Sequence, residues 1–253
     1  MSSSRASTEF LKRTFPPSIL KILELLEDRK MVLIEWETSL FNRHGYYPRV
    51  PGDLFFLTPD EQIEIIDDII LSLGHCKVRA EEGWYIGIGG VARAYTSDFS
   101  KVGSRYEIDC DPGSPVSYRS LTLVILPLSW TGIDRNELIQ LEESETNLPC
   151  TVWTMTFPSL CMALGRMYED AEFGTSLGQG LLDDLTRLIG KKFLWGANDE
   201  GISEMRKADV VIRQFDSWTY RSGEGKLKEL FVQMVITLQR RYFRWDAGIR
   251  DPY

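Results

Sequence analysis

The segment Val50–Gln62, VPGDLFFLTPDEQ, constrains the fold of this chain more than any other part of the sequence. A Pro-Gly pair opens it, Asp53 begins a short apolar run over Leu54–Leu57, and a helical pattern follows directly. An apolar run of this length between turn residues is typical of a buried strand. A buried strand that passes straight into a helix predicts an α/β fold, in which helices cover a sheet.

The helix predicted over residues 59–73 has recognisable ends. Thr58 is in the position of an N-cap, and the acidic residues of the first turn favour the helix dipole. Gly74 is the residue type that most often ends a helix. The apolar residues recur at helical spacing and predict one face packed on the sheet. They are Ile63, Ile66, Ile70 and Leu73.

Further strands and helices are predicted on both sides of this unit. Strands are expected over residues 31–35, 84–95, 105–108, 121–126 and 151–155, and helices over 19–26, 158–169, 177–191, 200–215 and 223–243. The predicted fold class is therefore α/β (α+β), with a mixed β-sheet flanked by helices. We expect a flexible N-terminal tail over 1–15, an α/β domain over 16–195, and a helical C-terminal extension over 196–253 packed on the same domain.

Composition restricts the partners of the chain. It has 253 residues and a formal net charge of −8, so it presents no general basic field for phosphate backbones, and nucleic acid is disfavoured as a partner. No stretch approaches the roughly 20 apolar residues of a membrane span, and the N-terminus lacks a secretory signal, which predicts a cytoplasmic protein without membrane contact. The 4 cysteines have no CxxC spacing and there are 2 histidines, so neither a zinc site nor a disulfide framework is indicated.

The predicted strand after Asp53 has half of a metal-binding pattern. In metal-dependent nucleotidyl transfer, a strand carries two carboxylates two residues apart, because alternate residues share a face and can hold divalent ions against a triphosphate. Here the two positions are Asp53 and Phe55, and phenylalanine cannot bind a cation. This strand therefore predicts no metal site.

The order of the elements resembles that of a known family. The helix Ile19–Leu26 and the strand Met31–Glu35 come first, the strand with its PDEQ helix (residues 59–62) follows, and a last strand at 151–155 leads into two helices that end near Ile189. This order is similar to that of fungal nucleotidyltransferase-like proteins, degenerate relatives of aminoglycoside nucleotidyltransferases and bacterial abortive-infection toxins. The family continues its first strand into a Gly-Gly or Gly-Ser turn, where this chain has Trp-Glu-Thr-Ser at 36–39.

The resemblance implies a nucleotidyltransferase-like fold and a catalytically degenerate protein, or pseudoenzyme, that binds a small molecule or nucleotide in the ancestral cleft. Arg166 stands where the relatives carry a basic residue near the sugar or phosphate, which makes it a candidate for ligand binding. Asp183 and Asp184 resemble the family's helix acid near the site. A basic residue near a helix end and acids in a first turn are also ordinary features of helices.

The same family pattern can also be matched to a later part of the chain. This second match, or register, predicts an active transferase. Gly89 and Gly90 precede Asp109 and Asp111 by about twenty residues, as a phosphate-binding turn precedes an Asp-x-Asp strand. In this register the two aspartates bind Mg²⁺ and the glycines admit a nucleotide. The Pro-Gly-Ser-Pro sequence at 112–115 would end the strand at once, which counts against the register.

A third hypothesis is an enzyme of fungal secondary metabolism that uses the cleft for metal-independent chemistry. The 7 tryptophans and 10 tyrosines suit either an aromatic or polyketide-like substrate or a bulky core. The candidates for an acid or base are Glu35, Glu37, Asp53 and Tyr95. The sequence leaves open whether there is turnover, which ligand binds, and the oligomeric state.

Overall fold

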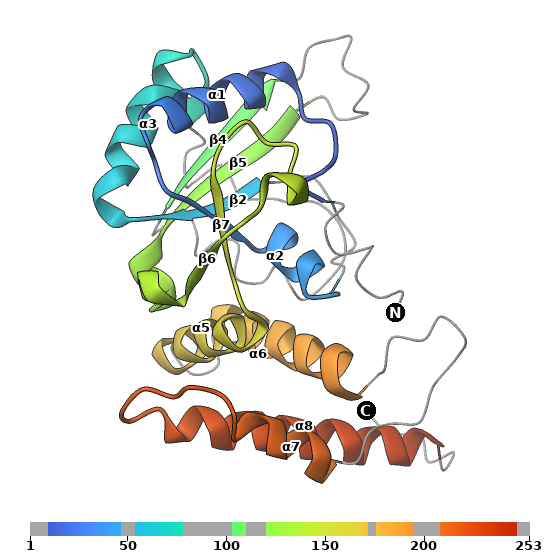
Figure 1. Ribbon diagram of the computed structural model, residues 1–253. Coiled ribbons are helices and arrows are strands. Elements are labelled where there is room, and N and C mark those ends of the chain that lie inside the picture. The colour runs from blue at the N-terminus through green and yellow to red at the C-terminus, as the bar shows by residue number, and fades with distance from the viewer. Residues whose placement is uncertain are drawn as a thin grey trace.

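The computed structural model describes residues 10–46, 54–77, 103–109, 120–171, 176–194 and 208–246. Figure 1 shows helices and a central sheet stacked in layers. The strand predicted over residues 84–95 lies outside the described residues, as do Asp53, Gly89, Gly90, Tyr95 and Asp111.

The sheet has seven strands among the described residues, in the order β3-β4-β5-β2-β1-β7-β6. They are β1 (Leu33–Trp36), β2 (Leu54–Thr58), β3 (Cys76–Lys77), β4 (Ser104–Asp109), β5 (Ser120–Pro127), β6 (Leu138–Gln140) and β7 (Val152–Met155). The pairs β1–β7 and β2–β5 are parallel, and the other neighbours are antiparallel. The predicted mixed sheet of an α/β protein is thus confirmed.

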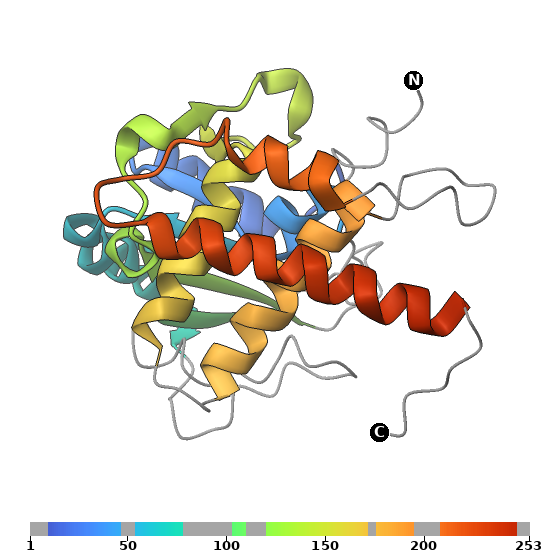
Figure 2. The same cartoon turned by 90° about the horizontal axis from the view of Figure 1, so that it is seen from below.

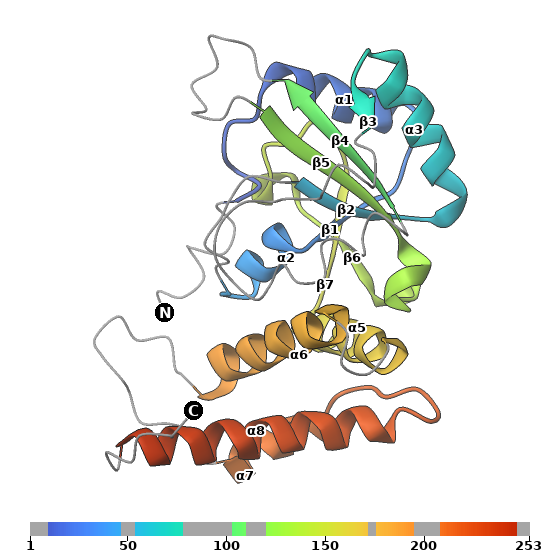
Figure 3. The same cartoon turned by 180° about the vertical axis from the view of Figure 1, so that it is seen from behind.

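Helices cover both faces of the sheet. The helices are α1 (Pro17–Asp28), α2 (Thr38–Arg43), α3 (Ile63–Ser72), α5 (Phe157–Asp170), α6 (Ser176–Ile189), α7 (Ala208–Phe215) and α8 (Gly225–Asp246), and a π-helical turn, η7 (Gly190–Leu194), follows α6. Short 3₁₀ turns are η1 (Asp60–Gln62), η4 (Leu128–Thr131), η5 (Arg135–Glu137) and η6 (Glu143–Glu145). Helices α1 and α3 lie on one face, and α5 and α6 on the other (Figures 1 and 3). Helices α7 and α8 lie across α5 and α6 as an outer layer (Figure 2).

Strand periodicity divides the core in two. Alternate residues of a strand point to opposite faces, so Leu54 and Phe56 of β2 pack with α1 and α3, and Phe55 and Leu57 pack on the side of α5 and α6. Phe55 is 6% exposed. The position where a second carboxylate would bind a metal is therefore part of the hydrophobic core.

The unit that follows β2 differs from its prediction at one end. Thr58 is the last residue of β2 rather than a helix cap, and its hydroxyl donates to Gln62 Oε1 at 3.3 Å. The same oxygen accepts the backbone N–H of Val32 at 2.8 Å, which ties the start of α3 to the segment before β1. A 3₁₀ turn fills the first part of the predicted helix, and α3 begins at Ile63. The other end is as predicted, because Gly74 has a φ of 84° just after the helix.

The first described residues and helices α7 and α8 pack on the core. Phe10, Leu11 and Phe15, which the sequence assigned to a flexible tail, are buried with α1 and α3. The backbone N–H of Asn147 donates to Leu11 O at 2.9 Å. The apolar side chains among residues 10–15 therefore extend the core, and the folded part begins before residue 16. At the other end, α7 and α8 share the core of α5 and α6.

Candidate functional site

Two of the site candidates among the described residues lie at the same edge of the sheet. Strand β1 ends at the edge where β2 begins, since Trp36 pairs with Phe55. Strand β4 ends at the same edge, since Asp109 pairs with Ser120 at the start of β5. Glu37, which follows β1, and Asp109 therefore lie at one edge, which we call the β1 edge.

Strand order keeps these two candidates apart. Strands β5 and β2 lie between β4 and β1, and neighbouring strands are about 4.8 Å apart, which separates Asp109 from Glu37 by about 14 Å along the edge. Oxygen ligands of one divalent ion lie within about 2.6 Å of it. Within the described part of the chain, no group of three His, Cys, Asp or Glu residues could hold a metal.

Glu35, a candidate acid or base, is used in a buried ion pair. Its side chain is fully buried in β1 and accepts hydrogen bonds from Arg43 of α2 and from the Thr154 hydroxyl of β7. Arg43 also donates to Glu145 Oε1 at 2.8 Å. Burial raises the pKa of Glu35, and the Arg43 guanidinium acts in the opposite direction. Because both oxygens of Glu35 face Arg43, we interpret Glu35 as the anchor that fixes α2 to the sheet.

Glu37 forms the turn between β1 and α2 in an uncommon conformation. Its φ is 51° and its ψ is −121°, a region that glycine adopts freely and other residues adopt at a cost. We call the junction Trp36–Thr38 the β1–α2 elbow. From residue 33 to residue 42, every side chain is buried except that of Glu37, which is partly exposed. The elbow therefore presents one carboxylate from an otherwise buried strand-turn-helix unit.

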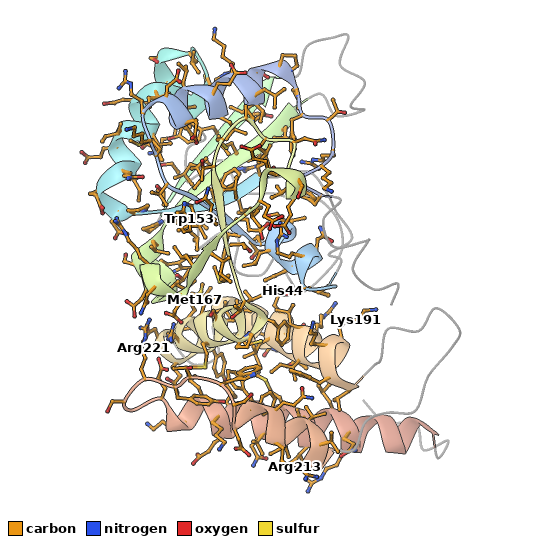
Figure 4. The ribbon with its side chains drawn as sticks, in the orientation of Figure 1. His44, Trp153, Met167, Lys191, Arg213 and Arg221 are labelled. Atoms are coloured by element: carbon orange, nitrogen blue, oxygen red, sulfur yellow. The ribbon has the colours of Figure 1, made fainter. Side chains whose placement is uncertain are left out.

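Helix α2 is fixed to its surroundings near both of its ends. The Ser39 hydroxyl donates to Trp36 O at 3.1 Å. His44 Nε2 lies 3.1 Å from Met155 O at the end of β7, and its ring packs edge-on against Phe157 at the start of α5. Burial lowers the pKa of His44 to about 4, so the neutral imidazole donates through Nε2 to the carbonyl. Figure 4 shows His44 between α2 and the layer of α5 and α6.

Tyr46, just after α2, is affected by charged groups of two elements. Its ring contacts Phe41 at a centroid distance of 5.8 Å. Burial raises the pKa of Tyr46, the carboxylates of Asp184 and Glu37 raise it further, and Arg187 lowers it through its charge and a hydrogen bond. Asp184 lies on α6 and is fully buried. Acids of both the elbow and α6 therefore raise the pKa of the Tyr46 hydroxyl.

Arg166, the predicted ligand-binding residue, is used elsewhere. Its Nε donates to Glu224 at 2.7 Å and its NH1 group donates to Gly132 O at 3.0 Å. Arg221, from the loop before α8, joins this network through Glu137 at 2.5 Å. Arg166 therefore connects α5 to η5 and to the start of α8, and none of these contacts involves a residue of the β1 edge.

Sequence reasoning did not single out Arg43, His44 or Tyr46. One signal for Arg43 was available. Glu35 sits within an apolar strand, and a carboxylate in a sheet interior requires a cation or several donors. The basic residue eight positions later in α2 meets this requirement. No local pattern marked Tyr46, because Asp184 and Arg187, which act on its hydroxyl, lie on α6.

Comparisons of the chain with models of protein families, with curated proteins and with solved structures found no match. Among the described residues, no helix has the length and apolar character needed to cross a membrane.

Proposed function

We propose that this chain is a catalytically degenerate protein with a nucleotidyltransferase-like core, and that it binds a small molecule at the β1 edge. The observation that carries the proposal is the presentation of Glu37 at the β1–α2 elbow. Uncommon backbone conformations of this kind cluster at functional sites, where the surrounding structure holds them in place. Three contacts hold the conformation of Glu37 in place: Ser39 with Trp36, Arg43 with Glu35, and His44 with Met155.

The residues at the carboxylate positions support the proposed loss of metal-dependent transfer. Phe55 is a core residue at the second position of the strand pattern. Glu35, the acid of the neighbouring strand, is already paired with Arg43. A divalent ion stabilises the transition state of phosphoryl chemistry by several kcal/mol, and neither of these residues replaces that contribution.

The charge of the elbow disfavours a phosphate as the ligand group. A glycine turn would let backbone N–H groups approach a phosphate, whereas here a carboxylate occupies the turn. Two like charges 4 Å apart repel by about 4 kcal/mol at an effective dielectric constant of about 20. The β1 edge thus favours a small molecule without phosphate groups over a nucleoside triphosphate.

Thermal unfolding tests the proposal, because a ligand that binds only the folded state raises the unfolding midpoint. The purified protein is tested against ATP, GTP, CTP and UTP, each with and without Mg²⁺, and against a panel of small metabolites. We expect no Mg²⁺-dependent shift with the nucleotides, and a shift with a metabolite that is lost in Glu37→Gln. The matched control is Glu64→Gln, an exposed acid on α3.

A Mg²⁺-dependent nucleotide shift that disappears in Asp109→Asn would contradict the proposal. It would favour the transferase hypothesis, in which Asp109 and Asp111 bind the metal.

The presentation of Glu37 also favours a second candidate function, a metal-independent enzyme in which Glu37 acts as base on an aromatic or polyketide-like substrate. A positioned carboxylate that is partly exposed can remove a proton from a bound substrate. Incubation with the metabolite that binds, followed by mass spectrometry, distinguishes the two functions. Turnover by the wild type and none by Glu37→Gln supports the enzyme, and an unchanged ligand supports a binding protein.

A further inference from the structure

Helix α3 buries one side and leaves the other side exposed. Its buried residues pack with α1 and the sheet. On the exposed side, the two large apolar residues Ile65 and Leu71 are 42% and 45% exposed. The exposed acids Glu64 and Asp68 lie between them at helical spacing. We call these four residues the α3 face. Protein interfaces combine apolar contact with polar groups around it, and the α3 face offers both.

The charge around the α3 face is negative. Residues 60–68 include five acids and no basic residue. Two of these acids have basic partners, since Arg135 binds Glu61 and Lys77 binds Asp67. The two ion pairs leave an excess of negative charge over this segment. A partner surface that carries basic residues is therefore favoured.

A surface of the opposite sign lies where α6 ends. Lys191 and Lys192 of η7 are exposed, and Figure 4 shows Lys191 at this end of the molecule. The nearby Arg187 already pairs with Asp183. Turn η7 packs on α7, where Val210 is 43% exposed. We call Lys191, Lys192 and Val210 the α6 end. It joins basic side chains to an exposed apolar one, which complements the acids and apolar residues of the α3 face.

The two surfaces cannot meet within one chain. Helix α3 lies with α1 on one face of the sheet, and α6 and α7 lie beyond the other face (Figures 1 and 3). A second copy of the chain, however, supplies whichever surface the first copy lacks. At an ionic strength of about 0.1 M the Debye length is about 10 Å. The charges within a contact therefore decide its sign, rather than the net charge of the whole protein.

We propose that the α3 face of one copy binds the α6 end of a second copy. Because the contact joins two different surfaces, each pair keeps one free surface of each kind, and association continues head to tail. Each surface consists of a few side chains, far fewer than the 20–30 residues a side of a stable interface. We therefore expect weak association, with a dissociation constant on the order of 0.1–1 mM. The contact does not depend on a ligand at the β1 edge.

Sedimentation equilibrium of the full chain tests the proposal. At an ionic strength of about 0.1 M, the average mass should rise above that of the monomer as the concentration approaches about 1 mM. At about 1 M the Debye length falls to about 3 Å, and we expect the association to weaken about fivefold or more. A protein that stays monomeric at about 1 mM under both conditions would overturn the proposal. If its binding to vesicles of anionic lipid then depends on Lys191, the α6 end contacts a membrane surface instead.

Two double variants remove one surface each. The face variant is Ile65→Ser with Asp68→Lys, and the end variant is Lys191→Ser with Val210→Ser. All four residues are exposed, so both proteins should fold, and their unfolding midpoints verify this. Each variant alone should associate at least about fivefold more weakly than the wild type.

Mixing the two variants tests whether the joined surfaces are different. The face variant keeps an intact α6 end, and the end variant keeps an intact α3 face. An equimolar mixture should therefore form one-to-one dimers and no larger species. An interface between two identical surfaces is not restored by such mixing, so a mixture that associates no better than its components would contradict the proposal.

A matched control separates this contact from a general effect of charge and apolar surface. The control variant is Ile139→Ser with Glu143→Lys, which makes the same kinds of change at two exposed residues of β6 and η6. It should associate as the wild type does. Equal weakening in the control and the face variant would show that the α3 face is not the contact surface.

Discussion

Replacing Glu37 with glycine tests whether the β1–α2 elbow is strained. A residue other than glycine in this region of backbone conformation costs about 1–3 kcal/mol. Glycine avoids this cost, but it loses about 0.5–1 kcal/mol more conformational entropy on folding than alanine does. We therefore expect Glu37→Gly to be more stable than Glu37→Ala, which keeps the strain and also lacks the carboxylate, by about 0.5–2 kcal/mol.

The two variants are compared by scanning calorimetry and by urea unfolding. For a chain of this size, 1 kcal/mol corresponds to about 2–4 °C in the unfolding midpoint, so Glu37→Gly should melt about 1–8 °C above Glu37→Ala. The matched control is the same pair of substitutions at Glu64, an exposed residue of α3. There glycine should be less stable than alanine by about 1 kcal/mol.

The sign of the difference decides the outcome. If Glu37→Gly melts below Glu37→Ala, as at an ordinary helix position, the elbow stores no strain. Its conformation would then give no support to a functional role for Glu37. If Glu37→Gly is more stable and also loses ligand binding, stability and function oppose each other at this residue.

Other substitutions test the ion pairs and the buried histidine. Arg43→Met leaves Glu35 buried without its cation and should cost about 3–5 kcal/mol in urea unfolding; a cost below 1 kcal/mol would show that the pair does not fix α2. Since the pKa of His44 falls to about 4 in the folded protein from 6.5, the unfolded state binds more protons between these pH values. Stability should therefore fall as pH decreases from 6.5 to 4, by up to about 3 kcal/mol for this residue, and His44→Gln should flatten that part of the stability–pH profile; an unchanged profile would contradict a neutral buried His44. Arg166→Met should cost about 3 kcal/mol because it breaks a mostly buried pair, whereas Arg135→Met, which breaks a pair with both side chains more than half exposed, should cost less than 1 kcal/mol. Equal costs for the two arginines would contradict this account.

The parts of the fold that were predictable are those with a local pattern. The apolar run at Leu54–Leu57 and the helix after it are both present. The apolar segment at 121–126 is an interior strand, flanked by β4 and β2. Gly74 ends α3 with the positive φ that glycine tolerates. In each case the residues that decide the structure are neighbours in sequence.

The start of α3 shows where local signals compete. Thr58 is a good capping residue by type, but β2 extends through it in a five-residue pairing with β5. Pro59 then begins a 3₁₀ turn, and the Gln62 side chain accepts hydrogen bonds from Val32 and Thr58. Sheet pairing therefore overrides the capping preference of Thr58.

The candidate site was only partly predictable, because its contacts are distant in sequence. Glu35 and Glu37 were recognised as acids, but their roles depend on residues of other elements. Thr154 is 119 positions from Glu35, and Asp184 acts on Tyr46 from α6. No sequence signal marked the conformation of Glu37 either. A positive φ is expected of glycine, and residues 36–39 contain no glycine.

The most direct test of the account is to locate the bound ligand in solution. Two-dimensional ¹H–¹⁵N NMR spectra of the protein are recorded during titration with the tightest ligand from the thermal screen. We predict that the backbone amides of Glu37, Thr38, Tyr46 and Asp184 shift with a common dissociation constant, and that they do not shift in Glu37→Gln. Saturable shifts confined to β3 and β4, with the amides of the elbow unchanged, would contradict a ligand site at the β1 edge.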